Sequence, residues 1–126
     1  MAAGRLILPS DALVDGGKGV RFALVPGAAE DKGFAIRHGG AVRAFVNRCP
    51  HLGVELDWQP GEFLDVTGLY LVCSTHGALF EPATGLCVAG PCRGAALARL
   101  GVEERDGQVH IHDESHAPRP AGNDRP

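Results

Sequence analysis

The sequence predicts an all-β fold. Short apolar stretches alternate along the chain with glycine and proline, which are abundant at 18 and 9 residues and suit tight turns between strands. No segment shows a convincing helical spacing of apolar residues, and no internal repeat is present. Several short strands punctuated in this way are typical of an all-β domain.

Each expected strand is bounded by a turn signal. Pro9 stops the first strand, Pro26 and Gly27 end the second, and Asp106 with Gly107 turns the last two into a hairpin. The segment from 10 to 19 is expected to be a loop. We expect strands at 6–8, 21–25, 34–38, 41–47, 69–72, 78–80, 86–88, 97–104 and 108–112.

The clearest hairpin is formed by 34–38 and 41–47. Gly39 and Gly40 between them supply the positive φ angles that a two-residue turn needs. On this interpretation one face carries four apolar residues: Phe34, Ile36, Val42 and Val46. The hairpin ends just before Cys49, so a stiff pair of strands delivers the loop that follows.

Length and charge limit the function classes. The chain has 126 residues, enough for one domain, which we expect at 1–112, followed by a polar, proline-rich and disordered tail at 113–126. A net charge of -3 and a pI near 6.0 give no reason to expect nucleic acid or an anionic membrane as partner. No apolar run approaches the roughly 18 residues that span a bilayer, and the N-terminus lacks a signal-peptide pattern. A cytoplasmic location is therefore expected.

Two short boxes carry the chemistry of this chain. The first is Cys49-Pro50-His51, closed by Gly53, and the second is Cys73-Ser74-Thr75-His76, closed by Gly77. Two cysteines and two histidines could hold a tetrahedral zinc ion. Zinc sites of this composition, however, typically pair Cys with Cys and His with His, whereas here each box pairs one Cys with one His.

The boxes resemble those of the Rieske [2Fe-2S] family. The resemblance spans roughly 21–112 and is strongest at 47–94, where C-x-H-L-G, C-x-x-H-G-x-x-F, a T-G turn and a G-P loop follow in order. It implies an antiparallel β base with a smaller cluster-binding subdomain of loops at about 47–94. It also implies a [2Fe-2S] cluster whose inner iron is ligated by Cys49 and Cys73 and whose outer iron is ligated by His51 and His76.

Departures from one branch of the family are informative. Rieske proteins of respiratory bc complexes join the boxes by a disulfide, but the matching positions here are Val54 and Thr75. That branch also places a Ser and a Tyr hydroxyl near the cluster, and these positions resemble Ala78 and Phe80. Because neither side chain donates a hydrogen bond, we predict a reduction potential of about -150 mV, at the low end of the Rieske range.

Three further side chains leave alternatives open. Cys87 and Cys92 flank Gly90-Pro91, the loop that covers the cluster in the family, and either a disulfide or a pair of buried free thiols is compatible with their spacing. The reducing cytoplasm favours free thiols. Trp58 is either a surface docking residue or, as is more common, a packing anchor between base and loops.

The resemblance implies a soluble Rieske-type ferredoxin, with no catalytic residue of its own. It would carry single electrons from a reductase to an oxygenase or similar oxidoreductase through transient docking. One alternative is a small subunit of a larger oxidoreductase, as in assimilatory nitrite reductases. Another is a non-enzymatic redox sensor or structural zinc module, which metal analysis and electron paramagnetic resonance (EPR) distinguish from an electron carrier.

Overall fold

The computed structural model describes residues 5–25, 32–50 and 53–112, and the strands in this part pair antiparallel in two sheets. The larger sheet has six strands. Their order across it is β1 (Arg5–Pro9), β9 (Gln108–His112), β8 (Arg99–Arg105), β4 (Ala41–Val46), β3 (Gly33–His38) and β2 (Val20–Phe22). The smaller sheet consists of β5 (Leu71–Val72), β6 (Leu79–Phe80) and β7 (Cys87–Ala89). The all-β prediction is confirmed.

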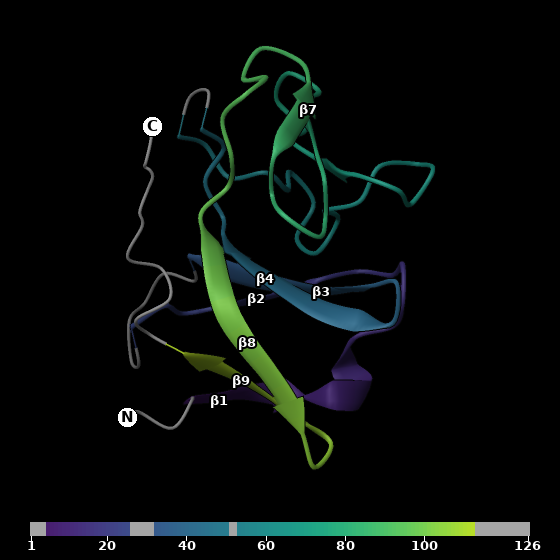
Figure 1. Cartoon of the computed structure of the whole chain (residues 1–126), viewed down its shortest axis with the longest axis vertical. Coiled ribbons are helices and arrows are strands. Elements are labelled where there is room, and N and C mark those ends of the chain that lie inside the picture. The colour runs from purple at the N-terminus through teal and green to yellow at the C-terminus, as the bar shows by residue number, and fades with distance from the viewer. Residues whose placement is uncertain (1–4, 26–31, 51–52, 113–126) are drawn as a thin grey trace.

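The two sheets occupy opposite ends of the molecule. Figure 1 shows the strands of the large sheet at one end and, at the other, β7 with the loops drawn in teal and green. Cys49 of the first box and the whole second box lie in the chain between β4 and β6, which contributes to this loop region. The arrangement is the predicted β base with a smaller loop subdomain.

One predicted loop has local structure of its own. Ser10–Ala12 forms a short 3-10 helix, η1, between β1 and the turn that leads to β2. A single turn of this kind has no apolar periodicity, so the sequence pattern does not reveal it.

The hairpin of β3 and β4 forms as expected, but its predicted apolar face is wrong. The register pairs Phe34 with Phe45 and Ala35 with Ala44. Phe34 and Ile36 therefore share a face with Phe45, whereas Val42 and Val46 lie on the opposite face with Ala35. Apolar residues cover both faces because this hairpin is packed on both sides.

Two core clusters flank the hairpin. The face that carries Ala35 and Val42 packs against Leu8, Val109 and other side chains of the large sheet. Against the other face pack side chains of the loop subdomain, including Phe63, whose ring stacks on that of Phe34 with the centroids 3.9 Å apart. The second cluster also contains all four cysteines of the chain, so it fixes the boxes to the β base.

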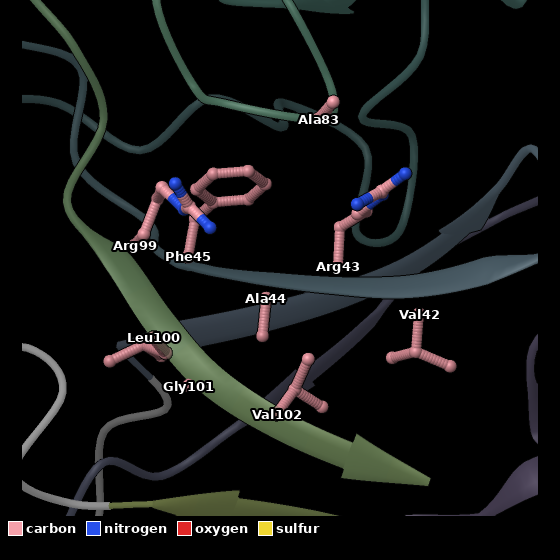
Figure 2. Close-up of a pocket in the computed structure, with 9 residues that line it drawn as sticks. All are labelled: Val42, Arg43, Ala44, Phe45, Ala83, Arg99, Leu100, Gly101 and Val102. Carbon is pink, nitrogen blue, oxygen red and sulfur yellow. The ribbon is translucent and has the colours of Figure 1, made fainter.

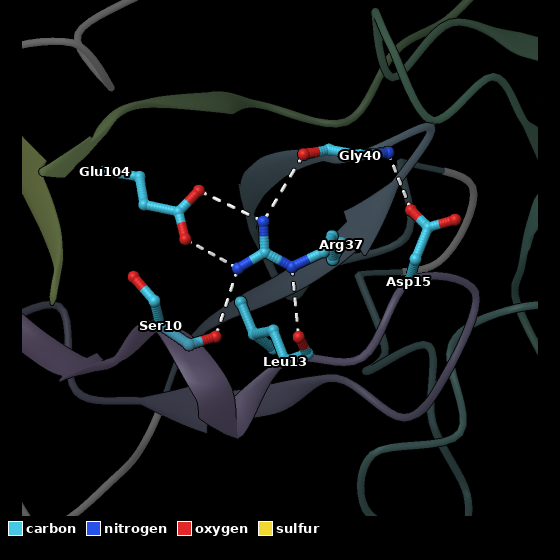
Figure 3. Close-up of polar contacts among 6 residues, drawn as sticks. All are labelled: Ser10, Leu13, Asp15, Arg37, Gly40 and Glu104. Atoms are coloured by element: carbon cyan, nitrogen blue, oxygen red, sulfur yellow. Dashed lines mark hydrogen bonds and ion pairs between the residues drawn. The ribbon is translucent and has the colours of Figure 1, made fainter. Parts of the chain in front are cut away.

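Arg37 connects three elements at the far end of the hairpin (Figure 3). Its Nε donates to the carbonyl of Leu13 at 3.0 Å and its Nη2 to that of Ser10 at 3.0 Å, while Nη1 and Nη2 reach the Glu104 carboxylate at 3.0 and 2.6 Å. The hydrogen bonds from Arg37 to the carboxylate are the main cause that lowers the pKa of Glu104 from 4.5 to about 2. The network therefore joins η1, β3 and β8.

Candidate metal centre

The two boxes fold into turns with the same hydrogen bonds. In each box the cysteine N–H donates to the carbonyl five residues later: Cys49 to Val54 at 2.7 Å, and Cys73 to Ala78 at 2.9 Å. The glycine four residues after each cysteine donates back to the cysteine carbonyl, at 2.7 Å for Gly53 and 2.8 Å for Gly77. These glycines have φ angles of 76° and 74°, which favour glycine at this point of the turn.

A buried polar clamp holds the first box at its base. Asn47, just before the box, accepts a hydrogen bond from the Leu56 N–H at 2.9 Å and donates to the Asp57 carboxylate at 3.0 Å. Asp57 also accepts from the Gly61 N–H at 3.0 Å and lies 3.6 Å from the Arg21 guanidinium. The clamp thus joins the chain entering the box to the chain leaving it.

The small sheet holds the second box. β5 leads into Cys73, and β6 begins after Ala78, so the box is the connection between two paired strands. Leu71 and Phe80, opposite each other in this pair, are fully buried. Packing on both sides of the turn fixes the direction in which the box projects.

In the part of the chain that the structure describes, two noncovalent contacts join the second box to the segment that follows the first box. The Ser74 N–H donates to the Leu56 carbonyl at 3.0 Å, and the Trp58 indole N–H donates to the Thr75 hydroxyl at 3.3 Å. By the family resemblance, Thr75 matches one of the two cysteines that form the disulfide in the bc-complex branch. Trp58 is 71% exposed, so the packing-anchor interpretation of this residue is wrong.

The structure places three of the four predicted ligands. Cys49 and Cys73 are 2% and 1% exposed and belong to the same core cluster, whereas His76 is exposed. His51 lies outside the described residues. Among the residues that are described, no group of three or more ligating side chains is arranged to hold a metal ion. The four-residue ligand set therefore stays a prediction.

Cys87 and Cys92 are free thiols in this structure. Their sulfur atoms lie 3.0 Å apart, with Cys92 donating to Cys87. Burial, followed by the influence of the Cys87 and Cys49 sulfurs, raises the pKa of Cys92 to about 12. Both thiols are buried in the same core cluster as Cys49 and Cys73.

Sequence reasoning missed the polar clamp. Asn47 and Asp57 are 4% exposed, yet polar residues flanking a loop are ordinary in sequence. The available signal was their position, one on each side of a predicted ligand loop. Their hydrogen bonding could not be predicted without knowing that the loop closes on itself.

A separate hollow lies between β4, β8 and the turn containing Ala83 (Figure 2). Its volume is about 330 Å³, and it opens where the two strands diverge after the Ala44–Leu100 pair. Arg43 and Arg99 supply its charged groups. No cysteine or histidine lines it, so the hollow is not part of the metal centre.

Comparison with known proteins identifies the family. The family model for the Rieske [2Fe-2S] domain matches residues 16–110. A search of curated proteins finds no match. No helix in the described ranges is long and apolar enough to cross a membrane.

Solved structures with the same fold include ferredoxins. A chain of the complex of reduced oxygenase and oxidized ferredoxin in carbazole 1,9a-dioxygenase is 25% identical, with a TM-score of 0.68 over 86% of this chain and 91% of that one. Sphingomonas yanoikuyae B1 ferredoxin is also 25% identical, with a TM-score of 0.67 over 86% of this chain and 97% of its own. The ferredoxin of carbazole 1,9a-dioxygenase from Nocardioides aromaticivorans IC177, 22% identical, shares the fold with a TM-score of 0.68 over 87% and 97%.

The family match covers most of the chain, and the boxes lie within it at the tip of an antiparallel β base. The chain therefore belongs to the Rieske [2Fe-2S] domain family, whose domains bind a [2Fe-2S] cluster.

Proposed function

We propose that this protein is a Rieske-type ferredoxin that delivers single electrons to an oxygenase, with Cys49, His51, Cys73 and His76 as cluster ligands. The observation that carries this proposal is the pair of equivalent box turns, with matching hydrogen bonds and glycine φ angles. Two similar turns whose cysteines lie in the same core cluster suit a cofactor with two metal atoms.

The described donors fit a [2Fe-2S] cluster. Two cysteines in the dry core are suited to ligate the inner iron as thiolates, and the exposed His76 suits the outer iron next to solvent. When bound, the cluster supplies a one-electron redox centre. A mixed set of two thiolates and two neutral imidazoles carries less negative charge than four thiolates, which makes reduction easier.

The chain's own residues position the centre and shape its surroundings. The Asn47–Asp57 clamp and the small sheet hold the two boxes, while Ala78 and Phe80, both buried, line the second box without a hydroxyl group. His76 provides an exposed edge through which a docked partner can exchange an electron. The exposed Trp58, bonded to Thr75 beside His76, lies on the same tip and is available to contact such a partner.

The structural relatives support the choice of partner. The matches to Sphingomonas yanoikuyae B1 ferredoxin and to a chain of the carbazole 1,9a-dioxygenase complex cover more than 90% of those chains. That complex contains a reduced oxygenase and an oxidized ferredoxin. By likeness we infer an oxygenase as acceptor and a reductase as donor for this chain, both docking transiently in the cytoplasm.

Spectroscopy of the purified holoprotein tests this proposal. We expect two irons and two sulfides per chain, and an EPR signal of a Rieske centre after reduction with dithionite. The variant His76→Ala should lose this signal, whereas the matched control His38→Ala, at a half-buried position outside the boxes, should keep it. A colourless protein containing zinc, or an unchanged signal in His76→Ala, would refute the proposal.

A further inference from the structure

Two arginines line the hollow between β4, β8 and the turn containing Ala83. Arg43 lies on β4 and Arg99 on β8, and Figure 2 shows both guanidinium groups on the side of the strands that faces this turn. No carboxylate is among the described residues that line the hollow. Two positive charges therefore share a space of about 330 Å³ without a negative side chain in its lining.

The register of the sheet brings the two arginines to one face. The described pairing of β4 with β8 joins Ala44 to Leu100 and Phe45 to Arg99. If this register continued, Arg43 would lie opposite a glycine, residue 101, which adds no side chain to the hollow. Arg43 and Arg99 are thus diagonal neighbours, and such positions are roughly 7–8 Å apart, within reach of long side chains. Both guanidinium groups can therefore contact the same bound group.

The described part of the chain supplies no acceptor for these two arginines. The Nε atom of Arg43 is buried and has no hydrogen-bond partner within 5–25, 32–50 and 53–112. Arg99 is exposed and forms no ion pair with these residues. Other arginines of the β base differ, since Arg5 donates to a carbonyl and Arg37 to a carboxylate. A buried donor without an acceptor costs free energy that a bound oxygen atom would recover.

The acidic residues closest along these elements have other partners. On β8, the Glu103 carboxylate lies 3.5 Å from the imidazole of His112 and 3.9 Å from the guanidinium of Arg105. Glu81, which precedes the turn at the far side of the hollow, accepts a hydrogen bond from the Thr84 hydroxyl at 2.8 Å. Neither carboxylate lines the hollow, so an anion from solution is needed to balance its charge.

We propose that the hollow is a binding site for a small oxyanion, held between the guanidinium groups of Arg43 and Arg99, and that a phosphate group is its preferred ligand. Guanidinium N–H groups form a fixed fork that matches phosphate and carboxylate oxygens. The tetrahedral phosphate directs oxygens toward two guanidinium groups, whereas the two oxygens of a carboxylate suit a single fork. The volume lies at the lower end of the range for ligand pockets, which suits a free small molecule.

Titration of the holoprotein with inorganic phosphate tests this proposal. Nuclear magnetic resonance follows the arginine Nε–Hε signals, and sodium chloride keeps the ionic strength constant so that screening does not change. We expect saturable shifts of the Arg43 and Arg99 signals with a dissociation constant on the order of 1 mM, since charge-assisted hydrogen bonds form at a partly open site. Acetate should bind at least about tenfold more weakly. Tighter binding of acetate than of phosphate would overturn the assignment to phosphate.

Substitutions in the hollow identify the groups that bind. Arg43→Gln and Arg99→Gln should each raise the dissociation constant at least about tenfold, because each removes a charged donor fork. Arg99→Lys should give an intermediate value, since it keeps the charge but loses the fork. The matched control is Arg105→Gln, which removes an exposed arginine from the same strand outside the hollow. Its effect should stay within about twofold, because salt screens distant charges.

Two results would refute the site. Shifts that grow linearly with phosphate and do not saturate would show that the ion is attracted only by the general charge of the surface. An equal loss of affinity in Arg105→Gln and Arg99→Gln would show the same. The amide spectrum of each variant reports whether its fold is kept. Because binding is measured at arginines outside the boxes, failure of this test leaves the proposed electron-carrier function untouched, and the reverse also holds.

Discussion

At the scale of single residues, the boxes depend on polar side chains outside the predicted ligand set. Asn47 is the clearest case, because its amide satisfies the Leu56 N–H and one oxygen of the buried Asp57 carboxylate. The predicted ligands could be named from sequence because closely spaced cysteine and histidine, repeated in two boxes, are typical of metal sites. Asn47 could not be named in this way, since buried hydrogen bonds depend on how the loop closes.

We expect Asn47→Ala to lower the free energy of unfolding by about 2–3 kcal/mol, since it leaves a buried donor and a buried carboxylate oxygen without partners. Urea denaturation of the holoprotein measures this loss. Gln59→Ala, which removes an exposed amide from the same loop, serves as the control and should change stability by less than about 0.5 kcal/mol. Equal effects of the two variants would show that the clamp does not stabilise the first box.

At the scale of elements, most strands followed from the sequence. The β3–β4 hairpin and the β8–β9 hairpin have strong turn signals at Gly39-Gly40 and Asp106-Gly107, and both formed close to the expected bounds. The predicted face for Val42 and Val46 was wrong. A strand that is buried on both faces has no alternation of apolar and polar residues, so the sequence does not distinguish one face from the other. The equivalence of the two box turns was not predicted either, because the pattern of side chains in the sequence does not specify which backbone groups form hydrogen bonds.

A pair of glycines tests the importance of the box turns. Gly77 and Gly68 both have a φ angle of 74°, and a Cβ at either would meet no atom within 4 Å. Substitution by alanine should therefore cost about 1 kcal/mol of stability at each position. Only Gly77→Ala should accelerate loss of the cluster, followed by the decay of visible absorbance at constant temperature. Similar decay rates in the two variants would contradict a specific role for the box turn.

At the scale of the whole molecule, Arg37 and Glu104 stabilise the β base. They are 67 residues apart in sequence, and nothing in the charge pattern pairs them before the sheet order is known. The pKa of Glu104 is lowered to about 2 from 4.5, so its folded form binds a proton less readily than its unfolded form. Its contribution to stability is therefore complete above about pH 4.5 and is lost as the pH falls toward 2.

We expect Glu104→Gln to lower stability by about 1 kcal/mol at pH 6, a modest value because the pair is partly exposed. The difference between variant and wild type should shrink as the pH falls from 4.5 toward 2. Urea midpoints at pH 6 and pH 3 measure the effect, with Glu103→Gln on the same strand as control. A difference that stays constant across this pH range would exclude the carboxylate as its source.

The second box is linked to the segment after the first box by a main-chain hydrogen bond and by an indole N–H that donates to a hydroxyl. Neither can be cleaved by glutathione or thioredoxin. In a homologue with a disulfide at this place, strongly reducing surroundings would break that bond. In this chain the four cysteines are free thiols, so there is no disulfide here to break. This link is therefore expected to be indifferent to the ratio of thiols to disulfides in its compartment.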